Sequence, residues 1–131
     1  MKDIRFRAWD KQHDMFDKEQ VFITQAGVIC DLTGLGWTLN HYDDWKRYDI
    51  QFYTGLKDKN GIEIYEGDII KTNRGIIAEV YWSKSGASFM ISYPNIWTSR
   101  IGKRIYKKLM NWHSKCEVIG NIYEHPSYRE E

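Results

Sequence analysis

Carboxylates gather in one short stretch of the chain, QFYTGLKDKNGIEIYEGDII at residues 51–70, among glycines and aromatic residues. Carboxylate oxygens are the ligands that Ca²⁺ and Mg²⁺ prefer. An EF-hand loop starting at Asp58 would have Glu63 at the position of the invariant glycine and Ile69 at that of the final glutamate, so the stretch does not match a calcium loop. Glu63, Glu66 and Asp68 leave one enzymatic alternative open, a metal-assisted hydrolase.

The same stretch has the pattern of a hairpin followed by a bend. Asn60-Gly61 favours a type I′ turn, because both residues tolerate a positive φ. Gly67 predicts a bulge or tight bend between two strands. Asp68 is then expected to accept hydrogen bonds from nearby backbone N–H groups. We favour this structural interpretation, and we expect no metal site, no cofactor and no catalytic residue.

The cysteines and histidines offer little other chemistry. Cys30 and Cys116 are the only cysteines, and neither belongs to a CxxC motif. We expect two free, mostly buried thiols, since disulfides are rare in a reducing compartment. His113 and Cys116 have the spacing of zinc ligands, but a zinc site needs about four ligands. The remaining ligands would have to come from isolated residues: Cys30, His13, His41 and His125.

A basic segment, SRIGKRIYKKLMNW at residues 99–112, is the best candidate for a binding site. Its apolar residues recur at helical spacing, which predicts a short amphipathic helix with a cationic face opposite an apolar one. That face could bind nucleic-acid phosphates, with nearby aromatic residues stacking on bases, or it could bind an acidic protein surface. The alternative is that the cationic face binds nothing and is simply exposed to solvent. The cationic residues are Arg100, Lys103, Arg104, Lys107 and Lys108.

Charge is distributed unevenly along the chain. Residues 1–70 contain 9 Lys or Arg and 13 Asp or Glu, whereas residues 71–131 contain 10 and 5. No acidic residue occurs between Glu79 and Glu117. Because the two halves are complementary, we expect the protein to form a homo-oligomer.

The composition predicts a folded protein rich in strands. The 131 residues suit one compact unit, and six Trp, nine Tyr and five Phe favour pleated, half-buried surfaces. Short strands are expected around residues 4–9, 20–24, 27–32, 50–54, 62–71, 76–82, 87–93 and 116–124, with 33–49 an irregular join. There is no apolar run long enough to span a bilayer and no signal peptide, so we expect a cytoplasmic protein.

Three blocks of the sequence resemble one known family. IRFRAWD (4–10), QFYTGLKDKNGIEIYEGDII (51–70) and EVIGNIYEHP (117–126) are similar to blocks of the YopX family of bacteriophage and prophage proteins. His125 departs from the family, which usually has Asn there, and the basic stretch at 97–112 is not expected to be shared. The resemblance implies an SH3-like β-barrel from about residue 50 onward. It implies no activity, since the family is functionally uncharacterised.

These observations predict a mainly β protein with an N-terminal β segment (1–49), a small SH3-like antiparallel barrel (50–131) and one short amphipathic helix. We expect a non-enzymatic binding or assembly module in the cytoplasm of the host bacterial cell. Nucleic-acid binding through the basic face at 100–108 is the alternative function.

Overall fold

The computed structural model describes residues 5–17, 21–33, 38–42, 47–94 and 104–126. Nearly all the regular elements in these ranges are β-strands, and the exceptions are the short 3-10 helices η1 (Leu109–Asn111) and η2 (His113–Lys115). The prediction of a mainly β protein is therefore confirmed. The chain divides into two compact units, Arg5–Gln51 and the residues from Phe52 onward.

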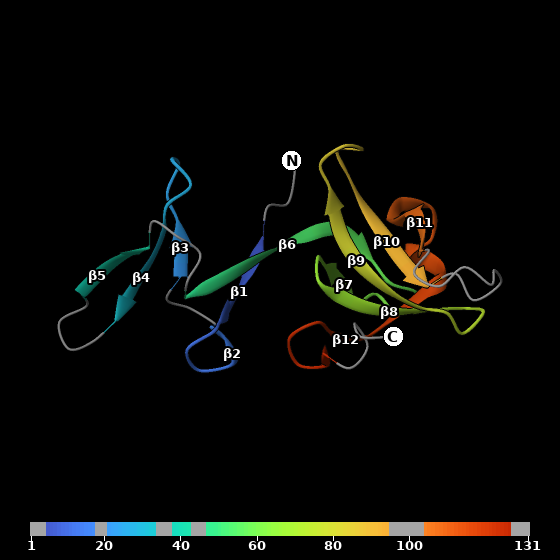
Figure 1. The fold of residues 1–131 in the computed structure, drawn as a ribbon, viewed down its shortest axis with the longest axis horizontal. Coiled ribbons are helices and arrows are strands. Elements are labelled where there is room, and N and C mark those ends of the chain that lie inside the picture. The colour runs from blue at the N-terminus through green and yellow to red at the C-terminus, as the bar shows by residue number, and fades with distance from the viewer. Residues whose placement is uncertain (1–4, 18–20, 34–37, 43–46, 95–103, 127–131) are drawn as a thin grey trace. The chain divides into compact units, whose positions relative to one another are not determined.

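The N-terminal unit contains a hairpin, a three-stranded meander and the start of a long strand (Figure 1). The strands are β1 (Phe6–Asp10), β2 (Met15–Asp17), β3 (Val21–Ile23), β4 (Ile29–Thr33), β5 (Thr38–Tyr42) and β6 (Tyr48–Lys57). β6 pairs with β1 and continues into the second unit. The strands predicted around 4–9, 20–24 and 27–32 are thus confirmed.

The irregular join predicted over residues 33–49 is wrong in part, because β5 lies within it. β5 pairs in register with β4, with Asp31 opposite Asn40 and Thr33 opposite Thr38. The glycines and aspartates around this segment suggested a loop, but Thr38, Leu39 and Tyr42 are residue types that favour strands. Pairing with a neighbouring strand outweighs the weak local pattern.

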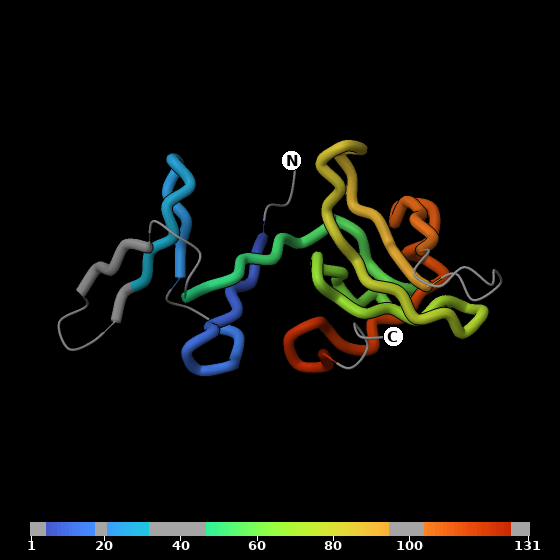
Figure 2. The backbone as a smooth tube through the Cα atoms, viewed as in Figure 1, coloured from blue at the N-terminus to red at the C-terminus, as the bar shows by residue number. Residues whose placement is uncertain are grey.

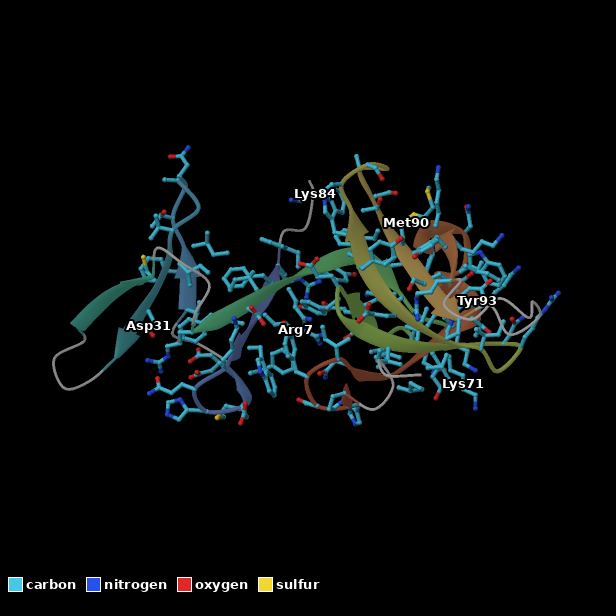
Figure 3. The ribbon with its side chains drawn as sticks, viewed as in Figure 1. Arg7, Asp31, Lys71, Lys84, Met90 and Tyr93 are labelled. Carbon is cyan, nitrogen blue, oxygen red and sulfur yellow. The ribbon has the colours of Figure 1, made fainter. Side chains whose placement is uncertain are left out.

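Alternation along β1 places different residues on its two faces. Ala8 is buried in a small apolar cluster with Ile29, Tyr48 and Ile50, against which Phe6, Val21 and Ile23 pack. On the other face, the guanidinium of Arg7 lies 4.6 Å from the ring centroid of Phe16, and its Nε donates a 2.8 Å hydrogen bond to Gln51 (Figure 3). Both faces of β1 are therefore used in packing.

A buried carboxylate anchors the meander to β6. Asp31 is fully buried, and the phenol of Tyr48 donates a 2.6 Å hydrogen bond to its Oδ2. Burial, together with this hydrogen bond, raises the pKa of Tyr48, so its proton stays in the bond at neutral pH. Burying a polar group is costly unless it is hydrogen-bonded, as Asp31 is here.

The C-terminal unit is built around a five-stranded sheet in the order β11–β10–β9–β8–β12. Its strands are β8 (Asp68–Thr72), β9 (Ile77–Ser83), β10 (Ser88–Pro94), β11 (Arg104–Lys108) and β12 (Cys116–Asn121). β7 (Glu63–Tyr65) pairs with the second part of β6. The sheet is strongly curled, so this unit forms a half-barrel (Figure 1).

The core of the half-barrel lies against one face of the sheet. Its buried residues are Ile64, Ile70, Ala78, Val80, Ile91, Leu109 and Cys116. Because the sheet curls around this core, the opposite face is convex. We call that opposite face, over β9, β10 and β11, the outer face.

Three hairpins end in the same kind of turn, and the first and the last of them are visible as tight reversals in Figure 2. The turns are Thr24–Val28, Asp58–Ile62 and Thr72–Ile76. In each, the first residue's N–H donates to the fifth residue's carbonyl, and the glycine at the fourth position donates to the first residue's carbonyl. The first residue's side-chain oxygen accepts from the fifth residue's N–H. Three turns of this chain thus share one sequence pattern, in which Thr or Asp lies three positions before glycine.

The type I′ turn predicted at Asn60-Gly61 is wrong in its type, although the hairpin is confirmed. Only Gly61 has a positive φ, of 80°, and Asn60 does not. The turn is a three-residue loop that places glycine in the left-handed region at its last position. Asp58 selects this geometry because its Oδ1 accepts from the N–H groups of Asn60 and Ile62, at 2.8 and 2.9 Å. The bend at Gly67 is confirmed, with a φ of 83°.

Candidate nucleic-acid interface

Most of the basic segment that the structure describes is a strand and not a helix. Residues 104–108 form β11, and η1 follows at Leu109. Arg100 and Lys103 lie outside the described residues. The helix predicted over 99–112 is therefore wrong for residues 104–108, and only the short 3-10 helix at Leu109–Asn111 is helical in the part of 104–112 that follows. Ile105 and Tyr106 favour strands, and pairing with β10 from Met90 to Pro94 supplies the backbone hydrogen bonds that a helix would otherwise provide.

A strand divides the basic residues between two faces, whereas a helix would have gathered them on one. Side chains alternate along β11, so Arg104, Tyr106 and Lys108 share one face and Ile105 and Lys107 the other. Lys107 lies opposite the core residue Ile91 in the neighbouring strand. The side chain of Lys107 therefore projects from the core side of the sheet. The three other residues belong to the outer face.

The register of β9 and β10 shows which residues accompany them. Met90 lies opposite both Tyr81 and Lys108, which places these three side chains in one row across the outer face. Ser92 lies opposite Tyr106 in the next row. Figure 3 shows Met90 on β10 and Lys84 at the tip of the β9–β10 hairpin. Lys84 is thus a more distant contributor.

Two tyrosines meet across β10. The ring centroids of Tyr81 and Tyr106 are 6.1 Å apart, with their planes at 76°. This edge-to-face arrangement is favourable for aromatic rings and fixes the orientation of Tyr106. Tyr106 nevertheless remains 56% exposed. The outer face therefore presents a held but accessible aromatic ring between two cationic residues.

Arg104 is anchored from β11 to β10. Its Nε donates a 2.9 Å hydrogen bond to the hydroxyl of Ser92, and its Nη2 donates a 3.1 Å hydrogen bond to the Ser92 carbonyl. Ser92 is only 5% exposed, whereas Arg104 itself is exposed. A guanidinium held in this way keeps its other N–H groups for a second acceptor such as phosphate.

The electrostatics of the outer face are cationic along β11 and acidic at one point on β9. Burial, and then the neighbouring Tyr106, raise the pKa of Tyr81, so its phenol is neutral at physiological pH. Glu79 lies opposite Ser92, in the row that contains Tyr106, and is half-buried. An anion on this face would thus be drawn to β11 and away from β9.

Two of the three carboxylates at residues 63–68 accept hydrogen bonds from the backbone. Glu66 Oε1 accepts a 2.9 Å hydrogen bond from the N–H of Phe52, and Asp68 Oδ2 accepts one of 2.8 Å from the N–H of Tyr65. Asp68 is only 2% exposed. The local role predicted for Asp68 is thus confirmed. Among the residues that the structure describes, no group of three or more His, Cys, Asp or Glu is placed to hold a metal ion.

Asp58 also has a structural position. Besides the two N–H groups of its own turn, it accepts a 3.0 Å hydrogen bond at Oδ2 from the N–H of Val118 in β12. The carboxylate is 6% exposed. It therefore joins the hairpin of β6 and β7 to the last strand.

Within the described residues, Cys30 and Cys116 form no disulfide, and both thiols are fully buried, as predicted. Burial, and then the carboxylate of Asp58, raise the pKa of Cys116, which disfavours the reactive thiolate. The Cys116 thiol donates to the Trp112 carbonyl at 3.0 Å, and Nδ1 of His113 lies 2.7 Å from the Lys57 carbonyl. Both side chains therefore contact backbone carbonyls.

Sequence reasoning missed Tyr81, Met90 and Ser92 as part of the candidate interface. The alternation of residues 76–82 and 87–93 was a usable signal, since it assigns Tyr81 to the face opposite Val80 and Ser92 to the face opposite Ile91. It was also necessary to recognise that residues 104–108 form a strand. The alternation of side chains along a strand, in place of helical spacing, puts Tyr106 on the same face as Tyr81.

The comparisons with known proteins agree with this architecture. A family model described as YopX protein matches residues 5–128. This chain belongs to the YopX family. The match spans the N-terminal β segment as well as the half-barrel, so both units are part of the family's pattern.

Two solved structures have a similar fold. One is protein EF1440 from Enterococcus faecalis, with a TM-score of 0.59 and 23% identity over 96% of this chain and 97% of that one. The other is protein yopX from Bacillus subtilis, with a TM-score of 0.52 and 19% identity over 94% and 95%. No curated protein sequence matches the chain. Within the described ranges, no helix has the length and apolar composition that a membrane span requires.

Proposed function

We propose that this protein is a non-enzymatic binding module whose ligand is nucleic acid, held on the outer face along β11. The observation that supports the proposal is the alternation of Arg104, Tyr106 and Lys108 on one exposed face. Cationic side chains bind phosphates, and an exposed aromatic ring between them can contact a base. An SH3-like topology, which the family resemblance implies, suits such a module by analogy.

Two other functions have less support. A metal-assisted hydrolase would use Glu63, Glu66 and Asp68, but two of these carboxylates accept backbone hydrogen bonds. An acidic protein surface would also complement Arg104 and Lys108, but it would make no special use of an exposed tyrosine. We retain self-association as a homo-oligomer, and a location in the cytoplasm of a phage-infected host cell, as further proposals. Light scattering of the purified protein tests the first, and a reporter fusion tests the second.

Fluorescence anisotropy with labelled DNA and RNA oligonucleotides tests nucleic-acid binding. Lys108→Glu should abolish binding at about 50 mM salt, because it reverses a charge beside Tyr106. Lys107→Glu is the matched control, since it makes the same change one residue away but on the core side. For single strands, log K falls as log salt rises, and Lys108→Ala should make this negative slope shallower by about 0.7.

The possible results separate the interpretations. Absence of binding by the wild-type protein at micromolar concentration would refute the proposal. If Lys107→Glu and Lys108→Glu reduce nucleic-acid binding equally, the outer face is not the binding site. Equally tight binding of poly-L-glutamate would indicate an acidic protein partner in place of nucleic acid.

A further inference from the structure

We infer that the outer face takes single strands, with one base stacked on Tyr106 and the flanking phosphates directed toward Arg104 and Lys108. This inference rests on the proposed function and names the class of nucleic acid. Three features of the outer face carry it: the exposure of Tyr106, the positions of the two cations, and the curvature of the sheet.

The exposure of Tyr106 suits a base more than a phosphate. Tyr81 contacts its ring edge-to-face from β9, while more than half of the side chain remains open to solvent. Stacking on an aromatic ring needs the flat face of a base, which every base has, so this contact does not depend on sequence. In a duplex those flat faces are already covered by neighbouring base pairs, and extruding a base requires unstacking and unpairing it.

The strand positions of the two cations flank Tyr106, and the Arg104 guanidinium turns back to Ser92, which lies opposite Tyr106. Arg104 and Lys108 are two residues before and two after Tyr106 on the same face of β11, so their Cα atoms are separated by roughly 13 Å along the strand. A nucleotide stacked on Tyr106 has a phosphate on each side of its sugar. One of these phosphates can thus approach Lys108, and the other can approach the Arg104 guanidinium beside Ser92.

The curvature of the sheet adds a steric argument. The core fills the concave side of the half-barrel, so the outer face bends away from any straight ligand placed on it. A stiff duplex would touch such a surface at few points. A flexible single strand can follow it and keep its phosphates near both cations.

The test compares oligonucleotides of about 12 nucleotides, a length within the usual range for single-strand binding domains. The ligands are an oligothymidylate, a DNA duplex of the same length, and an abasic strand that keeps the phosphates but has no bases. The proteins are the wild type, Tyr106→Ala and Tyr106→Phe. Trp82→Ala is the control, because Trp82 is also exposed but its side chain projects from the opposite face of the sheet.

The wild type should bind the oligothymidylate roughly tenfold more tightly than the abasic strand, and should prefer it to the duplex. Tyr106→Ala should remove both preferences, since binding would then depend on phosphates alone. Tyr106→Phe, which retains the ring, should restore them, and Trp82→Ala should leave them unchanged. Thermal melting of each variant separates loss of binding from loss of folding.

Each contrary result has a distinct meaning. If the wild type binds oligothymidylate, duplex and abasic strand equally, or if Tyr106→Ala keeps the preference, then the stacking inference is wrong while the proposed function stands. If the wild type binds none of these ligands, the proposed function itself is refuted. A preference that Trp82→Ala removes would move the stacking site to the core side of the sheet.

Discussion

Replacing Asp58 by alanine should destabilise the C-terminal unit strongly. The carboxylate accepts three backbone hydrogen bonds, from Asn60, Ile62 and Val118. Asn60 and Ile62 are exposed, so without the carboxylate their N–H groups can donate hydrogen bonds to water. Loss of each bond to Asp58 then costs about 1 kcal/mol. The N–H of Val118 lies between β12 and the buried carboxylate, and its loss costs about 1–3 kcal/mol. We expect a total of about 3–5 kcal/mol.

A second variant separates the local bonds from the tertiary one. Thr24 and Thr72 hold the same kind of turn with a single hydroxyl oxygen. Asp58→Thr should therefore keep the turn and lose only the bond to Val118, at a cost of about 1–3 kcal/mol. Lys59→Ala is the control, because its exposed ion pair with Glu117, at 3.5 Å, is worth about 0–1 kcal/mol.

Urea denaturation followed by tryptophan fluorescence measures these differences. The expected order of stability is wild type and Lys59→Ala, then Asp58→Thr, then Asp58→Ala. A loss below about 1 kcal/mol in Asp58→Ala would refute the structural role of the carboxylate. If Asp58→Thr is as unstable as Asp58→Ala, the bond to β12 and not the turn supplies the stabilisation.

Three further predictions concern other parts of the chain. Gly120→Ala should destabilise the protein by about 1–3 kcal/mol, because the new Cβ would lie 2.5 Å from Nδ1 of His125; Gly86→Ala, with 3.4 Å clearance, should cost less in the same melting assay. Burial raises the pKa of Asp10, but hydrogen bonds from His13, a backbone N–H and a guanidinium outweigh it and lower the pKa overall. Its stabilisation should therefore be complete above about pH 4 and decline as pH falls through the lowered pKa, and acid titration of Asp10→Asn should lack this decline. Cys116 should react slowly with Ellman's reagent in the native state and rapidly in urea, and a fast native thiol would contradict its burial.

Much of the half-barrel could be predicted from the sequence, because its elements are coded locally. The hairpin signal at Asn60-Gly61 and the bend at Gly67 identify reversals that the structure contains, although the turn type depends on Asp58. Strands around 76–82 and 87–93 follow from their alternation. Each of these signals lies within a few residues of the feature that it predicts.

The basic segment could not be predicted in the same way. Apolar residues at 101, 105, 109 and 112 fit helical spacing, and charge alone does not distinguish a helix from an edge strand. The outcome at 104–108 depends on pairing with β10, which is a tertiary interaction. The candidate interface shares this difficulty, since Tyr81 and Tyr106 are separated in sequence and meet only when β9, β10 and β11 are in register.

The repeated turn has a consequence for the order in which the chain folds. Closing a three-residue loop costs little entropy, and hairpins with local contacts form in roughly microseconds. We therefore expect the reversals at Thr24, Asp58 and Thr72 to be among the earliest native structure, while β12 must find β8 across a much longer loop. Asp58 takes part in both steps, because Oδ1 binds its own turn and Oδ2 binds Val118, which is 60 residues away. Folding rates of the two variants would then separate these events. Asp58→Thr loses only the bond of Oδ2 to Val118 and tests the docking of the C-terminal strand, whereas Asp58→Ala also loses the bonds of Oδ1 and tests formation of the turn.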